Sequence, residues 1–222
     1  RMSMYFLQPM TEGQRKYIGC RAGAAIGSNI VAKRLYSTVN VQETTPSLWL
    51  TASEMAFCKA EGVLRGWNMG GGTAKEYYER GVTLSFNQWG ADGVATYLLD
   101  DTSTEANYAD ALGGFGRAAA KASTITIKWD DNASMDEKME RLITQKWIAL
   151  FPNGQEAWNE IRRTGYPRIF SVSQATNGYT LLTPNRIPFD KNQQINNRSN
   201  YDKAVELLGG PDDYATPMWW QR

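Results

Sequence analysis

The side chains of this 222-residue chain that have the chemistry for catalysis or metal binding are carboxylates, some of them in adjacent pairs. The pairs are Asp100–Asp101, Asp130–Asp131 and Asp212–Asp213. No EF-hand spacing of oxygen ligands surrounds them. A glycosidase needs two carboxylates about 5–9 Å apart, and nothing in the sequence selects one such pair from the 23 acidic residues. We therefore interpret the pairs as solvated surface.

Composition excludes several other classes of chemistry. Histidine is absent, which removes the Ser-His-Asp triad, the Cys-His pair and every zinc site that contains histidine. The formal net charge is +1, from 24 Lys and Arg against 23 Asp and Glu, whereas a nucleic-acid binder needs a surplus of basic residues on one face. The run Gly70–Gly72 lacks the Gly-Lys-Ser/Thr of a phosphate loop. The sequence thus indicates no catalytic centre, metal or cofactor.

Aromatic residues are unusually frequent, at 12% of the chain with eight Trp. Rings of this size suit both cores and binding surfaces. The length allows one large domain or two small ones, and no apolar run approaches the roughly 18 residues of a membrane helix. The chain begins with Arg1 and shows no signal peptide, so we expect the amino-terminal part of a longer protein to be missing. A disulfide between Cys20 and Cys58 is compatible with the sequence but is not decided by it.

Residues 51–90 have the clearest pattern, that of two helices joined by a short loop. Capping boxes begin at Thr51 and Thr73, where a hydroxyl and a Glu three residues later satisfy the first helical N–H groups. Small and aromatic residues then recur at helical spacing, and Gly66 and Gly90 end the two patterns. The unit looks like one tetratricopeptide-type hairpin, which needs neighbouring structure to bury its apolar faces.

The second half predicts shorter helices separated by irregular segments. A capping box at Ser134 starts one helix, a second helix precedes Tyr166–Pro167, and a last one ends at Gly209. We expect Trp219–Trp220 to dock into the fold. The segments predicted to be mainly irregular are 1–45, 91–123 (with a short helix) and 171–199.

Three segments carry a family resemblance. They are the hairpin, which contains LTASEMAFCKAE at 50–61; the block QKWIALFPNGQEAWNEIRRTGYP at 145–167; and RIPF at 186–189 with Asn196–Asn197, Asn200–Tyr201 and Trp219–Trp220. Together they resemble the SusD/RagB family of nutrient-binding outer-membrane lipoproteins of Bacteroidetes, in its SusD-like branch. Family members often have Tyr-Pro where this chain has Phe189–Asp190, and a Glu nearby where this chain has Gln193 or Gln194. They are also about twice as long, so the resemblance identifies residues 1–222 as the carboxyl-terminal part of one SusD-like domain.

The resemblance implies a mainly α fold, in which a tetratricopeptide-like hairpin packs with irregular, loop-rich structure and few or no strands are present. It implies a protein that binds a glycan, or in some members a peptide, without catalysis at the cell surface. The bound oligosaccharide or polysaccharide would be delivered to a TonB-dependent, SusC-like porin of the outer membrane. The only membrane attachment would be an amino-terminal lipid anchor that lies outside this chain, and neither nucleic acid nor a cofactor is implied.

For a glycan, the aromatic residues to prefer are those that lie off any apolar periodic face. Trp67 beside Asn68 in the hairpin loop meets that condition, as do Tyr17 and Tyr36, the latter with Arg34 nearby. Flat rings match the C–H face of a pyranose, and amides or arginine donate to its hydroxyls. We assign the tryptophans of 145–167 to packing instead.

Two other functions stay open at this point. A carbohydrate-active hydrolase is one, because carboxylates are present even though none is singled out. A helical-repeat scaffold that binds only proteins is the other, because hairpins of this kind often serve that role. Release of reducing ends would favour the hydrolase, and glycan binding would exclude the plain scaffold.

Overall fold

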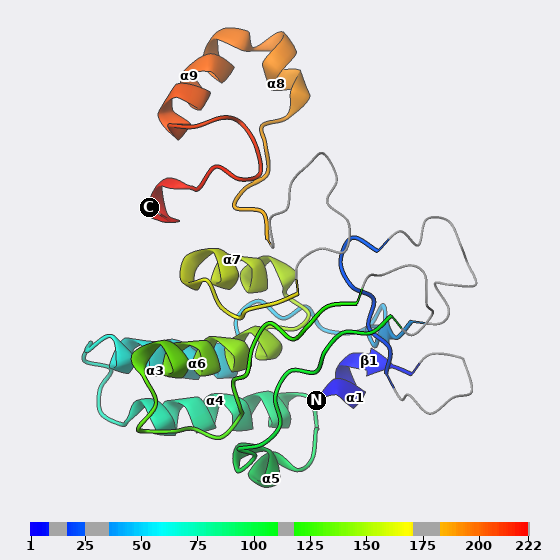
Figure 1. The fold of residues 1–222 in the computed structure, drawn as a ribbon, viewed down its shortest axis with the longest axis vertical. Helices are drawn as coiled ribbons and strands as arrows, with labels where there is room; N and C mark the ends of the chain where they lie inside the picture. The colour runs from blue at the N-terminus through cyan, green and yellow to red at the C-terminus, as the bar shows by residue number, and fades with distance from the viewer. Residues whose placement is uncertain (9–16, 25–35, 111–117, 171–182, 222) are drawn as a thin grey trace.

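The computed structural model describes residues 1–8, 17–24, 36–110, 118–170 and 183–221, and in these ranges the chain is mainly helical, as predicted. Its elements are α1 (Met2–Tyr5), β1 (Phe6–Leu7), β2 (Thr38–Val39), α3 (Ala52–Leu64), α4 (Ala74–Gln88), α5 (Val94–Leu98), α6 (Met135–Ala149), α7 (Gly154–Thr164), α8 (Lys191–Asn196), α9 (Arg198–Leu208) and the 3-10 helix η2 (Trp219–Gln221). Figure 1 shows α3, α4 and α6 side by side at one end, α7 beyond them, and α8 with α9 at the other end. No helix in the described ranges is both long and apolar enough to span a bilayer.

The predicted hairpin is present as α3 and α4. The Thr51 hydroxyl accepts the N–H of Glu54 at 3.1 Å and begins α3. Thr73 and Glu76 form a reciprocal capping box at the start of α4, with Oγ1 accepting the Glu76 N–H and the carboxylate accepting the Thr73 N–H at 2.7 Å. These bonds satisfy N–H groups that have no partner inside the helix. The two starts therefore lie where the sequence predicts them.

The core lies where α3, α4 and α6 meet. Phe57, Tyr78, Val82 and Leu142 are completely buried there. Gly81 lets Phe57 approach the backbone of α4, because a Cβ at Gly81 would lie 2.7 Å from Phe57 Cε1. Burial of these side chains stabilises the contact between the three helices. The hairpin thus finds one neighbour for its apolar faces within this chain.

A buried ion-pair network joins α7 to this core. Arg163 donates to Glu61 at 2.5 and 2.7 Å and to Glu160 at 2.7 Å, and Lys146 donates to Glu160 at 2.8 Å. Burial alone would raise the pKa of Glu61, but hydrogen bonds from Arg163 and Arg65 lower it. Burial alone would lower the pKa of Lys146, but the charge of Glu160 raises it. Glu61 and Lys146 therefore keep their charges at neutral pH, and each charged group of the network contacts a partner of opposite sign.

The sheet in the described ranges is small and antiparallel, with Phe6 opposite Val39 and Leu7 opposite Thr38. It holds α1 near the ends of α4 and α6. Arg1 donates to Ser85 Oγ at 3.2 Å, Tyr97 Oη at 2.9 Å and Gln145 Oε1 at 2.5 Å. The start of the chain is thus fastened to three helices. Cys20 and Cys58 are both free thiols.

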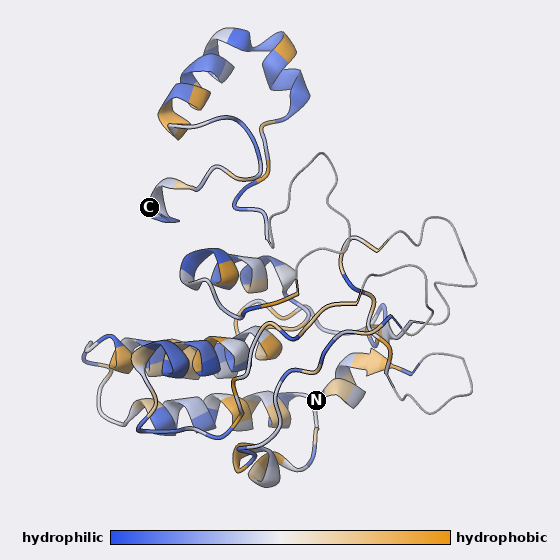
Figure 2. Cartoon of the chain, in the orientation of Figure 1, coloured by the Kyte–Doolittle hydropathy of each residue, from blue (hydrophilic) through white to orange (hydrophobic). Residues whose placement is uncertain are grey.

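Residues 186–216, here called the C-terminal lobe, are held by polar contacts rather than by an apolar core. Figure 2 shows that α8 and α9 are mostly hydrophilic. The side chain of Arg186 is 6% exposed, and its Nη1 lies 2.6 Å from Asp212 Oδ1. Asp212 also accepts the Phe189 N–H at 3.0 Å and the Tyr201 hydroxyl at 3.2 Å. The Asp212 carboxylate therefore links the beginning of the lobe, at Arg186 and Phe189, to helix α9, at Tyr201.

Three predictions for the carboxyl-terminal region were wrong. Segment 171–199 was expected to be irregular, but α8 forms because the Asp190 side chain accepts the Asn192 N–H at 2.7 Å and the helix packs on α9. Asp212 was assigned to the solvated surface, yet its side chain is only 4% exposed. Trp219 was expected to dock, yet it is 80% exposed, whereas Trp220 is 37% exposed.

Candidate ligand-binding site

The predicted contact Trp67 lies in the exposed loop between α3 and α4. Its side chain is 61% exposed, and the guanidinium of Arg65 lies 6.0 Å from its ring centre. Asn68 is exposed beside it, with its Oδ1 accepting the Gly70 N–H at 3.0 Å. The ring face is therefore accessible, and Trp67 is not among the described residues that line the two cavities presented below.

The other predicted contacts lie elsewhere. Figure 1 places the α3–α4 loop and the segments around Tyr17 and Tyr36 on opposite sides of the molecule, so the structure does not bring these residues into one site. Tyr17 is half-buried. Tyr36 is 5% exposed and donates to Asp110 Oδ1 at 3.0 Å; burial and this hydrogen bond raise its pKa. Arg34 lies outside the described residues.

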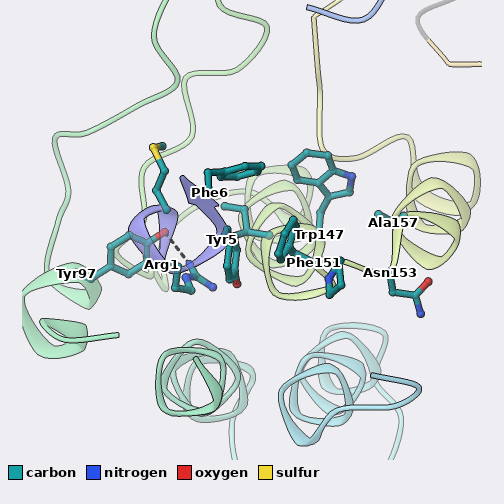
Figure 3. Close-up of a pocket in the computed structure, with 12 residues that line it drawn as sticks. Arg1, Tyr5, Phe6, Tyr97, Trp147, Phe151, Asn153 and Ala157 are labelled. Atoms are coloured by element: carbon teal, nitrogen blue, oxygen red, sulfur yellow. Dashed lines mark hydrogen bonds between the residues drawn. The ribbon is translucent and has the colours of Figure 1, made fainter. Parts of the chain in front are cut away.

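A cavity of about 520 Å³, here called the aromatic cavity, opens where α1, β1, α5, α6 and α7 converge. Its lining is dominated by the rings of Tyr5, Phe6, Tyr97, Trp147 and Phe151, and the other lining residues include Arg1, Asn153 and Ala157. Figure 3 shows these rings grouped around one space, with Asn153 and Ala157 contributed by the start of α7. The volume is within the range of about 300–1,000 Å³ that is common for small-molecule sites.

Three rings of the aromatic cavity, those of Tyr5, Phe6 and Phe151, contact one another. Tyr5 stacks on Phe151 with ring centres 4.4 Å apart, and Phe6 lies 5.4 Å from the same ring. Trp89 meets Tyr5 edge-on at 5.0 Å, and burial raises the pKa of the Tyr5 hydroxyl. Trp147 is 36% exposed, so it presents part of its ring to solvent. Rings held in this way lose little conformational entropy when a ligand stacks on them.

Few polar groups of the aromatic cavity face a ligand. The Arg1 guanidinium is already engaged with Ser85, Tyr97 and Gln145 and lies 4.9 Å from the Phe86 ring centre, so it positions α1. Asn153 accepts the Glu156 N–H through Oδ1 at 3.3 Å. Among the described residues nothing accepts a hydrogen bond from its NH₂ group, which is left to donate to a ligand oxygen.

A second cavity, also of about 520 Å³ and here called the arginine cavity, lies among the loops beyond the carboxyl end of α7. Arg21 and Arg168 are the charged residues of its described lining, which is otherwise apolar apart from Thr183. Arg21 is 9% exposed and donates to the Ala118 carbonyl at 3.3 Å. Its backbone N–H donates to the Tyr108 hydroxyl at 3.3 Å. Tyr108 also lies near Tyr36 and contributes to the raised pKa of the Tyr36 hydroxyl.

The described linings of the two cavities contain no carboxylate and no thiol. Within the described residues no three Cys, Asp or Glu side chains are grouped closely enough to hold a metal ion. Both cavities offer apolar surface with a few hydrogen-bond donors, which is the usual composition of a small-molecule binding site.

The aromatic cavity was not predicted, although the sequence contains a signal for it. Trp147 was assigned to packing because it follows the helical period of α6. Residues 147–151 are five consecutive apolar residues, and a helix with one buried face cannot bury five in succession. Such a run predicts a second apolar contact at the end of the helix, and here the rings of Trp147 and Phe151 form that second surface.

Comparison with known proteins agrees with the resemblance found in the sequence. The SusD-like family, described as Susd and RagB outer membrane lipoprotein, matches residues 1–221. A SusD homologue from Bacteroides uniformis is 40% identical, with a TM-score of 0.90 over 99% of this chain and 46% of its own. A SusD-like protein from Bacteroides thetaiotaomicron is 40% identical, with a TM-score of 0.91 over 99% of this chain and 47% of its own.

A third solved structure is that of a chitin-binding SusD homologue from Flavobacterium johnsoniae. It is 38% identical, with a TM-score of 0.86 over 98% of this chain and 45% of its own. The chain therefore spans about half the length of these relatives. The search of curated proteins found no match.

Proposed function

The chain belongs to the SusD-like family of outer-membrane lipoproteins, and from that membership we propose that it binds a glycan at the cell surface without catalysis. The observation that carries the proposal is the 38% identity, over 98% of this chain, to a homologue that binds chitin. The rigid aromatic cavity supports it, because ring faces are the protein surface that stacks best on the C–H face of a sugar. The lack of any carboxylate in the described lining of either cavity favours binding over hydrolysis.

The setting of this function is also part of the proposal. The chain covers 46% of the first relative's length, so it would be part of a longer protein, and we propose that this part is the carboxyl-terminal one. The complete protein would be held at the outer membrane by an amino-terminal lipid and would pass its oligosaccharide to a TonB-dependent, SusC-like transporter. Co-purification of such a transporter with the full-length protein tests the partnership separately from glycan binding.

Within this function we place the main glycan contact in the aromatic cavity, with Trp147 as the ring most open to a ligand. Trp67 remains a second proposed contact, with Asn68 beside it as a hydrogen-bonding partner. The two locations make different predictions, since Trp147 belongs to a cavity of several rings and Trp67 to an exposed loop. A cavity lined by several rings contacts a ligand on more than one side, so we expect the larger share of affinity from Trp147.

The test is calorimetry of the full-length protein with neutral oligosaccharides, chitin oligosaccharides among them, and with peptides. We expect binding of at least one glycan and a loss of about tenfold or more in affinity in Trp147→Ala, because removing a stacked ring costs about 1–3 kcal/mol. Trp219→Ala is the matched control, since Trp219 is exposed and lines neither cavity.

The possible outcomes separate the alternatives. Binding of no glycan would refute the proposal, and binding of peptides alone would favour a protein-binding scaffold. Release of reducing ends from a polysaccharide would favour a hydrolase. Unchanged affinity in Trp67→Ala would remove that residue from the site, and unchanged affinity in Trp147→Ala would move the site away from the aromatic cavity.

A further inference from the structure

The arginine cavity differs from the aromatic cavity in the groups that it presents. Its described lining contains two guanidinium groups and no carboxylate, whereas five of the lining residues of the aromatic cavity are aromatic. A guanidinium is a hydrogen-bond donor only and matches a carboxylate in a two-point contact. The two cavities therefore call for different ligand groups.

Arg168 is the side chain best placed to meet a ligand. It is 56% exposed, and its Nη2 lies 3.7 Å from Glu140 Oε2, which is longer than a hydrogen bond. Glu140 already has a closer partner, since its Oε1 accepts the Ser123 hydroxyl at 2.6 Å. Glu140 thus offsets part of the charge of Arg168 without occupying its donors.

Two carboxylates near the arginine cavity, those of Glu105 and Glu140, hold part of its wall in place by accepting hydrogen bonds. Glu105 Oε2 accepts the N–H groups of Ala122 and Ser123 at 2.7 and 3.0 Å. Together with the bond from Ser123 to Glu140, these contacts hold segment 118–123, whose alanines line the cavity. The carboxylates are engaged there, so the face that they support presents small apolar side chains to the ligand.

Thr183 adds a polar atom that lacks a partner. It lines the cavity, and its Oγ1 is buried with no hydrogen-bond partner within the described structure. Phe170 provides a ring in the same lining, fixed at 5.9 Å from the ring of Tyr108. A ring, a hydroxyl and an exposed guanidinium around about 520 Å³ match one sugar residue that bears a carboxylate, together with part of its neighbour.

We propose that the arginine cavity binds the carboxylate of an acidic sugar, a uronic acid residue within an oligosaccharide, through Arg168 with Thr183 accepting or donating at a hydroxyl. This inference rests on the proposed function, because it names the class of glycan that the protein takes. Arg21 shapes the wall of the cavity on the side of Ala118.

The experiment compares two ligands that differ in the charge of the carboxyl group and by one methyl group. The full-length protein is titrated with uronic acid oligosaccharides and with the same oligosaccharides after methyl esterification. We expect the acid form to bind about tenfold or more tightly, and Arg168→Gln to remove most of that difference while leaving the affinity for the ester unchanged. Arg198→Gln is the matched control, because Arg198 lies exposed on α9 and outside both cavities.

A second variant tests the hydroxyl without disturbing the fold. Thr183→Val keeps the shape of the side chain and removes an atom that has no partner in the free protein. We expect unchanged thermal stability and a several-fold loss of affinity for the acid form. An unchanged affinity would remove Thr183 from the site.

The outcomes distinguish this inference from the function on which it rests. Equal affinity for acid and ester would overturn the inference and leave glycan binding intact. Tighter binding of a glycan that carries sulfate groups but no uronic acid would do the same. Failure of every glycan to bind would overturn both.

Discussion

The helical core of α3, α4 and α6 and the C-terminal lobe are held together in different ways. In the core, completely buried side chains such as Phe57, Tyr78 and Leu142 meet between helices. In α8 and α9 no residue is buried, and the lobe depends on one carboxylate, that of Asp212, with its partners Arg186 and Tyr201. The comparison teaches that apolar packing makes the core cooperative, while the lobe is stable only as long as a few polar contacts persist.

The same difference explains which parts of the fold could be predicted. The helices of the core can be recognised from short stretches of sequence, because a capping box spans four residues and an apolar face repeats every three or four. Hence the starts at Thr51, Thr73 and Ser134 were predicted correctly. The lobe depends on pairs that are distant in sequence, such as Arg186 with Asp212, and no local period reveals such a pair.

The candidate site was less predictable for a related reason. The aromatic cavity combines rings from Tyr5, Tyr97 and Trp147, which lie in three separate segments, and the arginine cavity joins residue 21 to residues 168 and 183. Choosing aromatics off the apolar faces led to Tyr36, whose ring is buried and whose hydroxyl is bound by Asp110. A buried tyrosine with a distant acid as partner looks, in sequence, like an exposed tyrosine in a loop.

The largest expected effect is that of Phe57→Ala in the core. We expect it to lower the free energy of unfolding by about 3–5 kcal/mol, because a completely buried ring is lost and a cavity remains against Gly81. Chemical denaturation of the full-length protein measures the loss. Ile195→Ala is the control, since Ile195 is 75% exposed on α8 and should change stability by less than about 0.5 kcal/mol. Equal effects of the two substitutions would contradict the comparison.

A smaller and local effect is expected from Arg186→Met in the lobe. The substitution leaves the buried carboxylate of Asp212 without its ionic partner, at a cost of about 3 kcal/mol. We expect this cost to open the lobe rather than to unfold the core, so that amides of α8 and α9 exchange faster while those of α3 and α4 do not change. Hydrogen exchange followed by mass spectrometry resolves the segments, and Arg198→Met serves as the exposed control on α9.

Acid should reproduce the effect of Arg186→Met without a mutation. Burial alone would raise the pKa of Asp212, but hydrogen bonds from Arg186 and from the Phe189 N–H hold it below its ordinary value. The contribution of this carboxylate is therefore complete above the unfolded aspartate pKa of about 3.9 and is lost as the pH falls through the lowered value. We expect fast exchange in α8 and α9 to begin below about pH 4. Protection that persists through that range would show that the ion pair does not hold the lobe.

The smallest effect sharpens the comparison, because the same kind of contact is removed from both regions. Thr73→Ala deletes the cap of α4, and Asp190→Ala deletes the cap of α8, whose side chain accepts the Asn192 N–H at 2.7 Å. Each cap is worth about 1 kcal/mol. Because α4 belongs to the cooperative core, Thr73→Ala should lower the global free energy of unfolding by that amount. Asp190→Ala should leave the global value unchanged and raise exchange only within α8, and a global loss in both variants would show that the lobe and the core unfold as one unit.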